Sequence, residues 1–104
     1  MTEYDGDFEW NTEKAQQNLR KHGVSFQTAK EVFDDRHAAE LYDKDHSRHE
    51  HRFNLIGQSS YGLLFVVFVM TEEGRARLIS ARAADSRHRE LYEEEFIKNN
   101  FPLE

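Results

Sequence analysis

The sequence contains no cysteine, which excludes disulfide bonds and thiolate chemistry and leaves packing alone to stabilise the protein. It also lacks a long hydrophobic run, since the longest, 63–70, is too short to cross a bilayer as a helix. The acidic N-terminus does not show the basic and then apolar pattern of a secretory signal. We therefore expect a protein of the reducing cytoplasm that does not associate with membranes.

Positive charge is in the minority, because 14 Lys and Arg residues stand against 20 Asp and Glu residues and the net charge is -6. This balance argues against a general nucleic-acid coat, since an acidic surface repels the phosphate backbone. The charges are nevertheless unevenly distributed. Residues 1–13 contain five acids and no base, whereas residues 74–89 contain five arginines and one acid. The chain is therefore electrically polarised.

The apolar content that is present suits one compact domain over residues 1–104. Hydrophobic residues make up 38% of the chain, and eight Phe and four Tyr supply much of the apolar bulk. No repeat, linker or low-complexity segment interrupts the sequence. A second independent core is not expected.

Two helices are predicted in the first third of the chain, at 12–22 and 26–34. Asn11 and Ser25 are placed to cap their N-termini, and Gly23 to end the first helix. A third helix is predicted near the C-terminus, at about 86–98. The periodicity of the three helices predicts apolar residues that face the core: Ala15, Leu19, Phe26, Ala29, Phe33, Leu91 and Phe96.

Between the helices the apolar period changes to that of β-strands, which are predicted at 38–42, 52–58, 63–70 and 75–82. Simple alternation in the last strand sends Arg77 and Arg82 to opposite faces of the sheet. The acidic residues 1–6 are expected to be a loose start. Because the strands are joined by hairpin-length turns, the elements predict an α+β domain: two N-terminal helices, an antiparallel meander of about four strands and a C-terminal helix.

Short segments in a fixed order resemble the BrnT family of toxins over nearly the whole chain. These segments are Phe8-Glu9-Trp10, Lys14 with Asn18, Lys21 to Phe26, Val32-Phe33 with Asp35, Asp43 with His46-Ser47, Glu50 with Arg52-Phe53, Ile56-Gly57 with Ser59, Ile79 to Arg82 with Ala84, and Arg89 with Tyr92-Glu93. The resemblance implies a RelE-like fold, membership of a type II toxin-antitoxin system and RNA cleavage without a cofactor.

RNA cleavage by the ribose 2′-hydroxyl needs a base to take the hydroxyl proton, cations for the crowded phosphate and an acid for the leaving oxygen. On the resemblance and these needs, the candidate catalytic residues are Arg52, Arg82, Glu50, Lys21, His22 and Tyr92. If the second and fourth predicted strands of the meander present one face, Arg52 and Arg82 can clamp a single phosphate.

Each candidate also has a purely structural interpretation. An arginine on a strand can pair with an acid or lie on a solvated face. Lys21 and His22 suit the last turn of a helix, where cations interact favourably with the free carbonyls. Tyr92 suits a half-buried core position, and this interpretation is preferred to that of a proton donor.

The polar segment 43–51 contains three histidines and three acids, which is a composition that can bind a divalent metal. A structural metal site needs rigid ligands with supporting contacts, whereas this segment is predicted to be a loop with two competing cations. We therefore expect no metal cofactor. The weaker alternative is a metal held by His46, His49 and His51.

The resemblance further implies a DNA-binding antitoxin of the BrnA kind, RNA as substrate and a heterotetramer of two toxins with two antitoxins, and leaves open whether the ribosome takes part. The chain departs from the family pattern at four positions: Asn11 stands where the family usually has Asp, Leu63 where it often has Arg, and Glu72 and Glu73 where it has Arg or Lys, so cations that could contact RNA are missing. These departures motivate an alternative function: a toxin fold without catalytic activity that serves in a complex regulating transcription.

Overall fold

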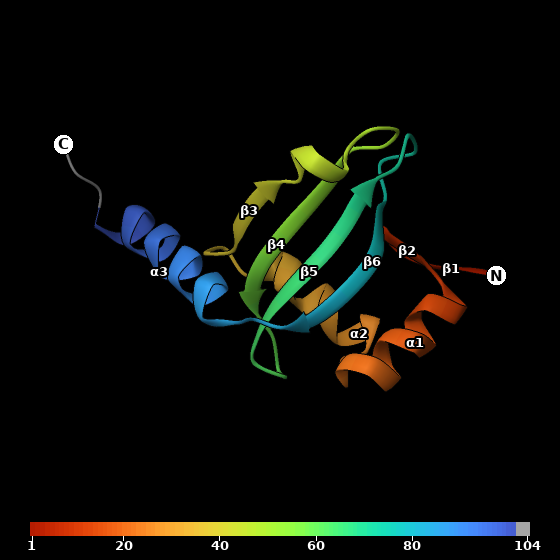
Figure 1. The fold of residues 1–104 in the computed structure, drawn as a ribbon, viewed down its shortest axis with the longest axis horizontal. Helices are drawn as coiled ribbons and strands as arrows, with labels where there is room; N and C mark the ends of the chain where they lie inside the picture. Colours follow the sequence, from red (N-terminus) through yellow and green to blue (C-terminus); the bar gives the residue numbers. More distant parts are fainter. Residues whose placement is uncertain (102–104) are drawn as a thin grey trace.

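The computed structural model describes residues 1–101 and contains one six-stranded sheet with helices on both faces (Figure 1). The strands lie in the order β1-β2-β6-β5-β4-β3. Their bounds are β1 Thr2–Asp5, β2 Phe8–Asn11, β3 Ala39–Tyr42, β4 Arg52–Gln58, β5 Leu63–Met70 and β6 Ala76–Ala83. The helices are α1 Thr12–His22, α2 Phe26–Ala29, α3 Ser86–Asn100 and the 3-10 helices η1 Lys30–Asp34 and η2 Lys44–His46.

The predicted α+β architecture is confirmed. Strands β3, β4, β5 and β6 form the expected antiparallel meander, with each strand paired to the next along the chain. Two helical segments precede the meander and α3 follows it. The predicted second helix is divided, because the chain is α-helical over 26–29 and then tightens to a 3-10 helix over 30–34. Apolar periodicity alone does not distinguish these two helix types.

The N-terminus is more ordered than expected, since β1 pairs antiparallel with β2 instead of forming a loose start. Gly6 makes this possible, because its φ of 60° lies in the left-handed region that a tight hairpin turn requires. β2 then joins β6 in parallel, with Phe8 opposite Ala76 and Glu9 opposite Arg77. The acidic N-terminal hairpin therefore lies beside the arginine-rich strand.

The predicted helix caps of the first half of the chain are confirmed. The Asn11 side chain accepts hydrogen bonds from the backbone N–H of Glu13 and Lys14, at 2.9 and 3.0 Å. Gly23 ends α1 with a φ of 71°, and Ser25 caps α2. These caps fix where α1 starts, and so where the side chains of its first turn lie.

One face of the sheet packs on α1, α2 and η1 and forms the main core. Its buried side chains are Trp10, Val24, Phe26, Ala29, Val32, Leu55, Leu64, Val66, Phe68, Ala76, Leu78 and Ala81. Gly57 on β4 allows η1 to approach closely, because a Cβ there would lie 3.0 Å from the Cβ of Val32. Contrary to expectation, Leu19 is 51% exposed, and the residue of α1 that the fold buries is Asn18.

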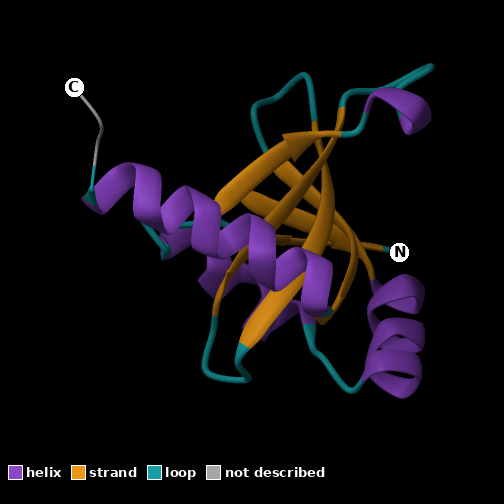
Figure 2. Cartoon of the chain, turned by 60° about the vertical axis from the view of Figure 1, so that its left-hand side comes forward, coloured by secondary structure: helices purple, strands orange, loops and turns teal. Residues whose placement is uncertain are grey.

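The other face of the sheet is covered by α3 only in part (Figure 2). The first half of α3 places Leu91 and Tyr92 against a small second core formed by Ala39, Ile56, Leu63 and Ala84. The helix then extends beyond the sheet, and for this reason Phe96, expected in the core, is 39% exposed. Within residues 1–101, no helix is long and apolar enough to cross a membrane.

A β-bulge in β6 changes the faces that alternation predicts. Val67 of β5 pairs with Ser80, but the next residue, Phe68, pairs with Leu78, so β6 carries one extra residue at this point. Leu78 and Ala81 consequently point into the same core, although they are three residues apart. The prediction that Arg77 and Arg82 lie on opposite faces is therefore wrong. The bulge brings both arginines to the face that α3 partly covers.

Candidate functional site

The part of this face that α3 leaves open carries two arginines in one row. Arg52 on β4 and Arg77 on β6 are both register partners of Val69 on the central strand β5. Two strand spacings place their Cα atoms about 10 Å apart. Val69 between them is only 4% exposed. The row therefore presents two guanidinium groups on either side of a buried valine.

A cavity of about 290 Å³ lies at this row, and we call it the cationic cavity. Its charged lining residues are Lys14 from the first turn of α1, Glu50 from the segment before β4, Arg52 and Arg77. Asn11, which caps α1, lines it as well. The cavity therefore combines three cations with one carboxylate in a protein whose net charge is -6.

Arg52 offers a hydrogen-bond donor that no other group of the described residues uses. Its Nη2 lies 3.4 Å from the Oε1 of Glu50, whereas its buried Nε has no hydrogen-bond partner within residues 1–101. On the same face of β4, the buried Oδ1 of Asn54 is also without a partner in that part of the chain. Buried polar atoms are nearly always paired in native proteins. Arg52 lines both cavities, so its guanidinium is the one of these two groups that faces a bound ligand, whereas Asn54 lines neither cavity.

Arg77 is held in place by a buried acid of the N-terminal hairpin. Glu9 is 3% exposed, and its Oε2 accepts a hydrogen bond from Nε of Arg77 at 3.0 Å and forms an ion pair with Nη2 at 2.9 Å. A guanidinium has five N–H donors, so several remain free after this contact. The parallel pairing of β2 with β6 thus fixes the orientation of an arginine that lines the cationic cavity.

A second cavity, of about 280 Å³, shares Glu50 and Arg52 with the first, and we call it the loop cavity. Its other lining residues come from the polar segment before β4: Asp45, His46, Arg48 and His49. Because the two cavities meet at Glu50 and Arg52, they form the two sides of one continuous surface.

The histidines of this segment have separate partners. The Nδ1 of His46 lies 3.0 Å from each carboxylate oxygen of Asp43, and the Nδ1 of His51 lies 3.3 Å from the hydroxyl of Tyr42. Over residues 1–101, no group of three or more His, Cys, Asp or Glu side chains is arranged to hold a metal ion. The structure thus does not assemble the alternative ligand set of His46, His49 and His51.

Arg82 lies on the same face as Arg52 but further along the sheet. Arg52 is opposite Val69 and Arg82 opposite Phe65, a separation of four residues or roughly 13 Å along β5. The Cζ of Arg82 lies 5.3 Å from the centre of the Phe65 ring, which stacks on His88 at 4.0 Å. The two arginines therefore share a face without sharing a contact. A clamp on a single phosphate remains a prediction.

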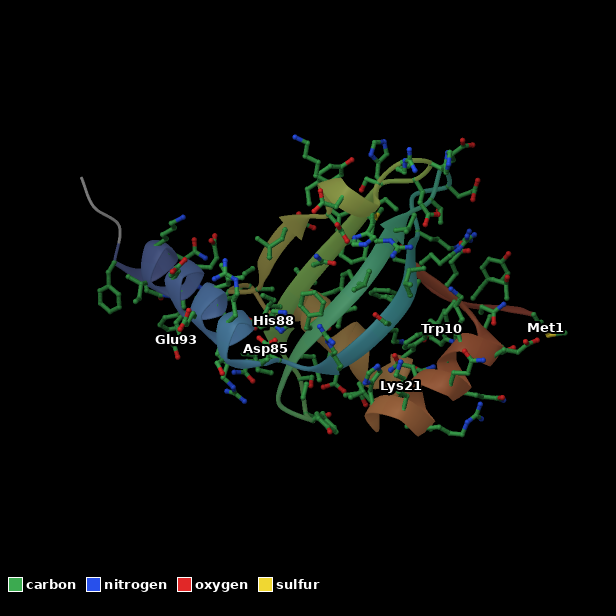
Figure 3. All side chains as sticks on the ribbon, viewed as in Figure 1. Met1, Trp10, Lys21, Asp85, His88 and Glu93 are labelled. Atoms are coloured by element: carbon green, nitrogen blue, oxygen red, sulfur yellow. The ribbon has the colours of Figure 1, made fainter. Side chains whose placement is uncertain are left out.

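His88 belongs to the start of α3, where it forms a capping box with Asp85 (Figure 3). Burial lowers the pKa of His88; Asp85 opposes this effect, and Arg82 and Arg87 add to it. The Asp85 carboxylate accepts a hydrogen bond from the backbone N–H of His88 at 2.9 Å, which lowers the pKa of Asp85. The cap holds His88 in place, and the stacking of His88 on Phe65 anchors α3 to the sheet at the Arg82 end of the face.

Lys21 and His22 lie in the last turn of α1, whereas Lys14 in its first turn lines the cationic cavity. Seven residues separate Lys14 from Lys21, or roughly 10 Å of helix. Figure 3 labels Lys21 near the C-terminal end of α1. Neither Lys21 nor His22 lines the cationic or the loop cavity. Their position suits an interaction with the free carbonyls of the helix end.

Tyr92 is half-buried and has a structural partner. Its hydroxyl donates a hydrogen bond of 2.7 Å to the Oδ2 of Asp35, which also accepts from the backbone N–H of Gln58. Burial and the nearby Asp35 carboxylate raise the pKa of Tyr92 to about 12. Burial alone would raise the pKa of Asp35, but the hydrogen bonds from Gln58, Tyr92 and His37 outweigh it and lower that pKa. Tyr92 therefore ties α3 to the end of η1.

Replacing Tyr92 by phenylalanine is expected to lower the free energy of unfolding by about 1 to 1.5 kcal/mol at pH 7, because it removes a hydrogen bond to a charged but partly exposed group. The phenol with the raised pKa stabilises the fold below its unfolded-state value near 10 and loses this effect as the pH rises toward 12. Urea denaturation at pH 7 and pH 11 measures both effects. A gap between wild type and Tyr92→Phe that does not narrow at pH 11 would contradict the assignment.

Sequence reasoning identified Glu50 and Arg52 but missed three neighbours, which are Lys14, Arg77 and Asn54. Alternation along 52–58 contained the signal for Asn54, since it shares a face with Arg52. Arg77 was missed because the bulge in β6 changes the faces of the strand from those that simple alternation predicts. Nothing local to α1 indicated that the first turn of this helix adjoins β4 and β6, because that contact depends on the parallel pairing of β2 with β6.

Comparison with known proteins identifies the family. The sequence model described as "Ribonuclease toxin, BrnT, of type II toxin-antitoxin system" matches residues 10–88, which is most of the chain. The chain belongs to the BrnT family. It is thus a ribonuclease toxin of a type II toxin-antitoxin system, and its family implies an antitoxin partner. No curated protein sequence matches it significantly.

The fold is similar to the crystal structure of the Brucella abortus ribonuclease toxin BrnT, with a TM-score of 0.58 and 25% sequence identity. The match covers 74% of this chain and 94% of that chain. The residues matched by the family model, 10–88, include Arg52 and Arg77 but not Glu9, and they contain only the first three residues of α3. Most of α3 therefore lies outside the matched residues.

Proposed function

We propose that the chain cleaves RNA at the junction of the cationic and loop cavities, with Arg52 and Glu50 in contact with the scissile phosphodiester. The observation that carries this proposal is the position of Arg52, which lines both cavities, has two further cations beside it in the cationic cavity, and has an Nε without a partner within residues 1–101. A phosphate oxygen is a natural acceptor for this donor, and arginine binds phosphate in a fixed geometry.

The proposed chemistry uses the charges that the junction provides. Glu50 takes the proton of the ribose 2′-hydroxyl, whose oxygen attacks the adjacent phosphorus. Arg52 stabilises the negative charge that develops on the non-bridging phosphate oxygens. The bond from phosphorus to the 5′-oxygen of the next nucleotide then breaks, this oxygen takes a proton from water, and the products carry a 2′,3′-cyclic phosphate and a 5′-hydroxyl. In this scheme the arginines supply the positive charge that a metal ion would otherwise provide, so no metal is required.

Arg82 fits this proposal as a contact to RNA further along the same face, not as a second clamp on the scissile phosphate. Its distance of four residues along β5 from the Arg52 row supports that placement. We assign no step of the reaction to Lys21, His22 or Tyr92, because none of them lines the junction.

For the partner we propose a DNA-binding antitoxin of the BrnA kind that covers the open part of this face. A complex of two toxins and two antitoxins follows if the antitoxin dimerises on DNA. Two features support this position for the antitoxin: α3 leaves part of the sheet surface uncovered, and positive charge is in local excess there.

The test is cleavage of a fluorescently labelled RNA by the purified toxin after release from its antitoxin, with and without EDTA and with and without ribosomes. We expect cleavage that EDTA leaves unchanged and products that end in a cyclic phosphate. Inhibition by EDTA that added metal reverses would contradict the metal-free scheme. If no cleavage occurs with or without ribosomes, the protein is instead a binding component of a regulatory complex.

A further inference from the structure

We propose that Lys14 and Arg77 form a second phosphate subsite, which binds a phosphate of the RNA chain next to the scissile one; this inference rests on the ribonuclease function proposed above. The subsite occupies the side of the cationic cavity away from the loop cavity. It assigns a substrate-binding role to two residues of α1 and β6 that the reaction itself does not require.

The geometry separates this subsite from the site of cleavage. Glu50 and Arg52 line both cavities, whereas Lys14 and Arg77 line the cationic cavity alone. An RNA strand with its scissile phosphate at Arg52 can therefore extend into the cationic cavity on one side and into the loop cavity on the other. The cationic cavity, at about 290 Å³, has the volume of roughly ten water molecules of ~30 Å³ each. This volume suits a phosphate with part of its sugar.

The donors of the subsite are available, and Arg77 is held in place. Lys14 forms no ion pair with any residue in 1–101, and Arg77 keeps free donors after its contacts with Glu9. The α1 N-terminus does not supply the charge, because the Asn11 side chain already accepts from the N–H groups of Glu13 and Lys14. Side-chain cations are thus the anion-binding groups. Glu9 acts as a positioning residue that holds Arg77 toward the cavity.

The experiment pairs a protein variant with a matched change in the RNA. The substrate is the shortest oligoribonucleotide that the wild type cleaves, together with versions in which one phosphate beside the scissile one is replaced by a neutral methylphosphonate. The rate constant kcat/KM is measured for wild type, Lys14→Ala, Lys14→Arg and the exposed control Lys98→Ala. The effect of the neutral phosphate replacement is compared between the wild type and each variant. The difference between these effects isolates the interaction of Lys14 with that phosphate.

At one flanking position, we expect the neutral replacement to reduce kcat/KM of the wild type and of Lys98→Ala about tenfold, mainly through KM. The same replacement should reduce kcat/KM of Lys14→Ala by only about threefold, because the contact with Arg77 is then the one left to lose, and Lys14→Arg should behave as the wild type. Equal sensitivity of wild type and Lys14→Ala at both flanking positions would overturn the subsite.

A binding measurement keeps the subsite testable if the cleavage proposal fails. The Kd for a non-cleavable 2′-O-methyl oligonucleotide is measured over a range of salt concentrations. Lys14→Ala should weaken binding and reduce the slope of log K against log salt by about 0.7, the value for one phosphate contact to a single strand. An unchanged slope would overturn the subsite, whatever the outcome for cleavage. Binding with the expected slope but no cleavage would contradict only the proposed reaction.

Discussion

Replacing Arg52 by alanine is expected to reduce kcat for RNA cleavage by about 100-fold or more, with a smaller change in KM. The guanidinium is proposed to stabilise charge that develops only in the transition state, and removal of one such donor typically costs this factor. The fold should tolerate the change, because the side chain makes one weak contact with Glu50 and its Nε has no partner within residues 1–101. Single-turnover cleavage of labelled RNA measures the effect.

Two further variants make this result specific. Arg52→Lys keeps the charge but not the geometry of the guanidinium, so it should recover only part of the lost activity. Arg36→Ala removes an exposed arginine that lines neither cavity and should cleave as the wild type. Arg52→Ala with normal kcat and an unchanged melting temperature would remove Arg52 from the reaction.

Replacing Asn18 by alanine is expected to lower the free energy of unfolding by about 4 kcal/mol, since it leaves three buried backbone groups without a partner. The Asn18 amide donates to the carbonyls of Val24 and Ala81 at 2.9 and 2.8 Å and accepts from the N–H of Ala81 at 3.0 Å. β2 pairs with β6 only at residues 76 and 77. Beyond that point, Asn18 takes the place of a neighbouring strand for β6.

A loss of this size is a large fraction of the 5 to 15 kcal/mol that stabilises a typical domain. Urea denaturation followed by circular dichroism measures it, and the control is Gln17→Ala on the exposed side of the same helix. The control should change stability by less than about 0.5 kcal/mol. An Asn18→Ala variant as stable as the control would show that the edge of β6 is satisfied in another way.

The parts of the fold that the sequence predicted are those controlled by local chemistry. Asn11, Gly23 and Ser25 act where the capping rules placed them, because a cap depends only on neighbouring residues. The meander was predictable from the apolar pattern and the short turns between its strands. The resemblance of the sequence to the BrnT family was confirmed by the match of the family model to residues 10–88.

The parts that the sequence did not predict depend on pairing between distant segments. β1 contains few apolar residues and owes its order to β2 and the turn at Gly6. The bulge in β6 has no glycine to signal it, yet it decides that Arg77 and Arg82 share a face. Leu19 was assigned to the core by periodicity, whereas the fold buries Asn18 to complete the edge of β6.

The same distinction applies to the candidate site. Glu50 and Arg52 are two residues apart, so their proximity could be expected from the chain alone. Lys14 and Arg77 reach the cavity only through the parallel pairing of β2 with β6. The family resemblance indicated Tyr92 as a catalytic candidate but did not reveal its hydrogen-bond partner. The hydrogen bond from its hydroxyl to Asp35 shows that Tyr92 joins α3 to η1.

The most direct test of the account is to map where RNA binds by NMR. The amide and arginine side-chain signals of the wild type are followed while a 2′-O-methyl oligonucleotide, which cannot react, is added. The account predicts the largest shifts at Lys14, Arg52 and Arg77, and none at Lys21 and His22. Shifts centred on the end of α1 that carries Lys21 and His22, with the Arg52 signals unchanged, would contradict it.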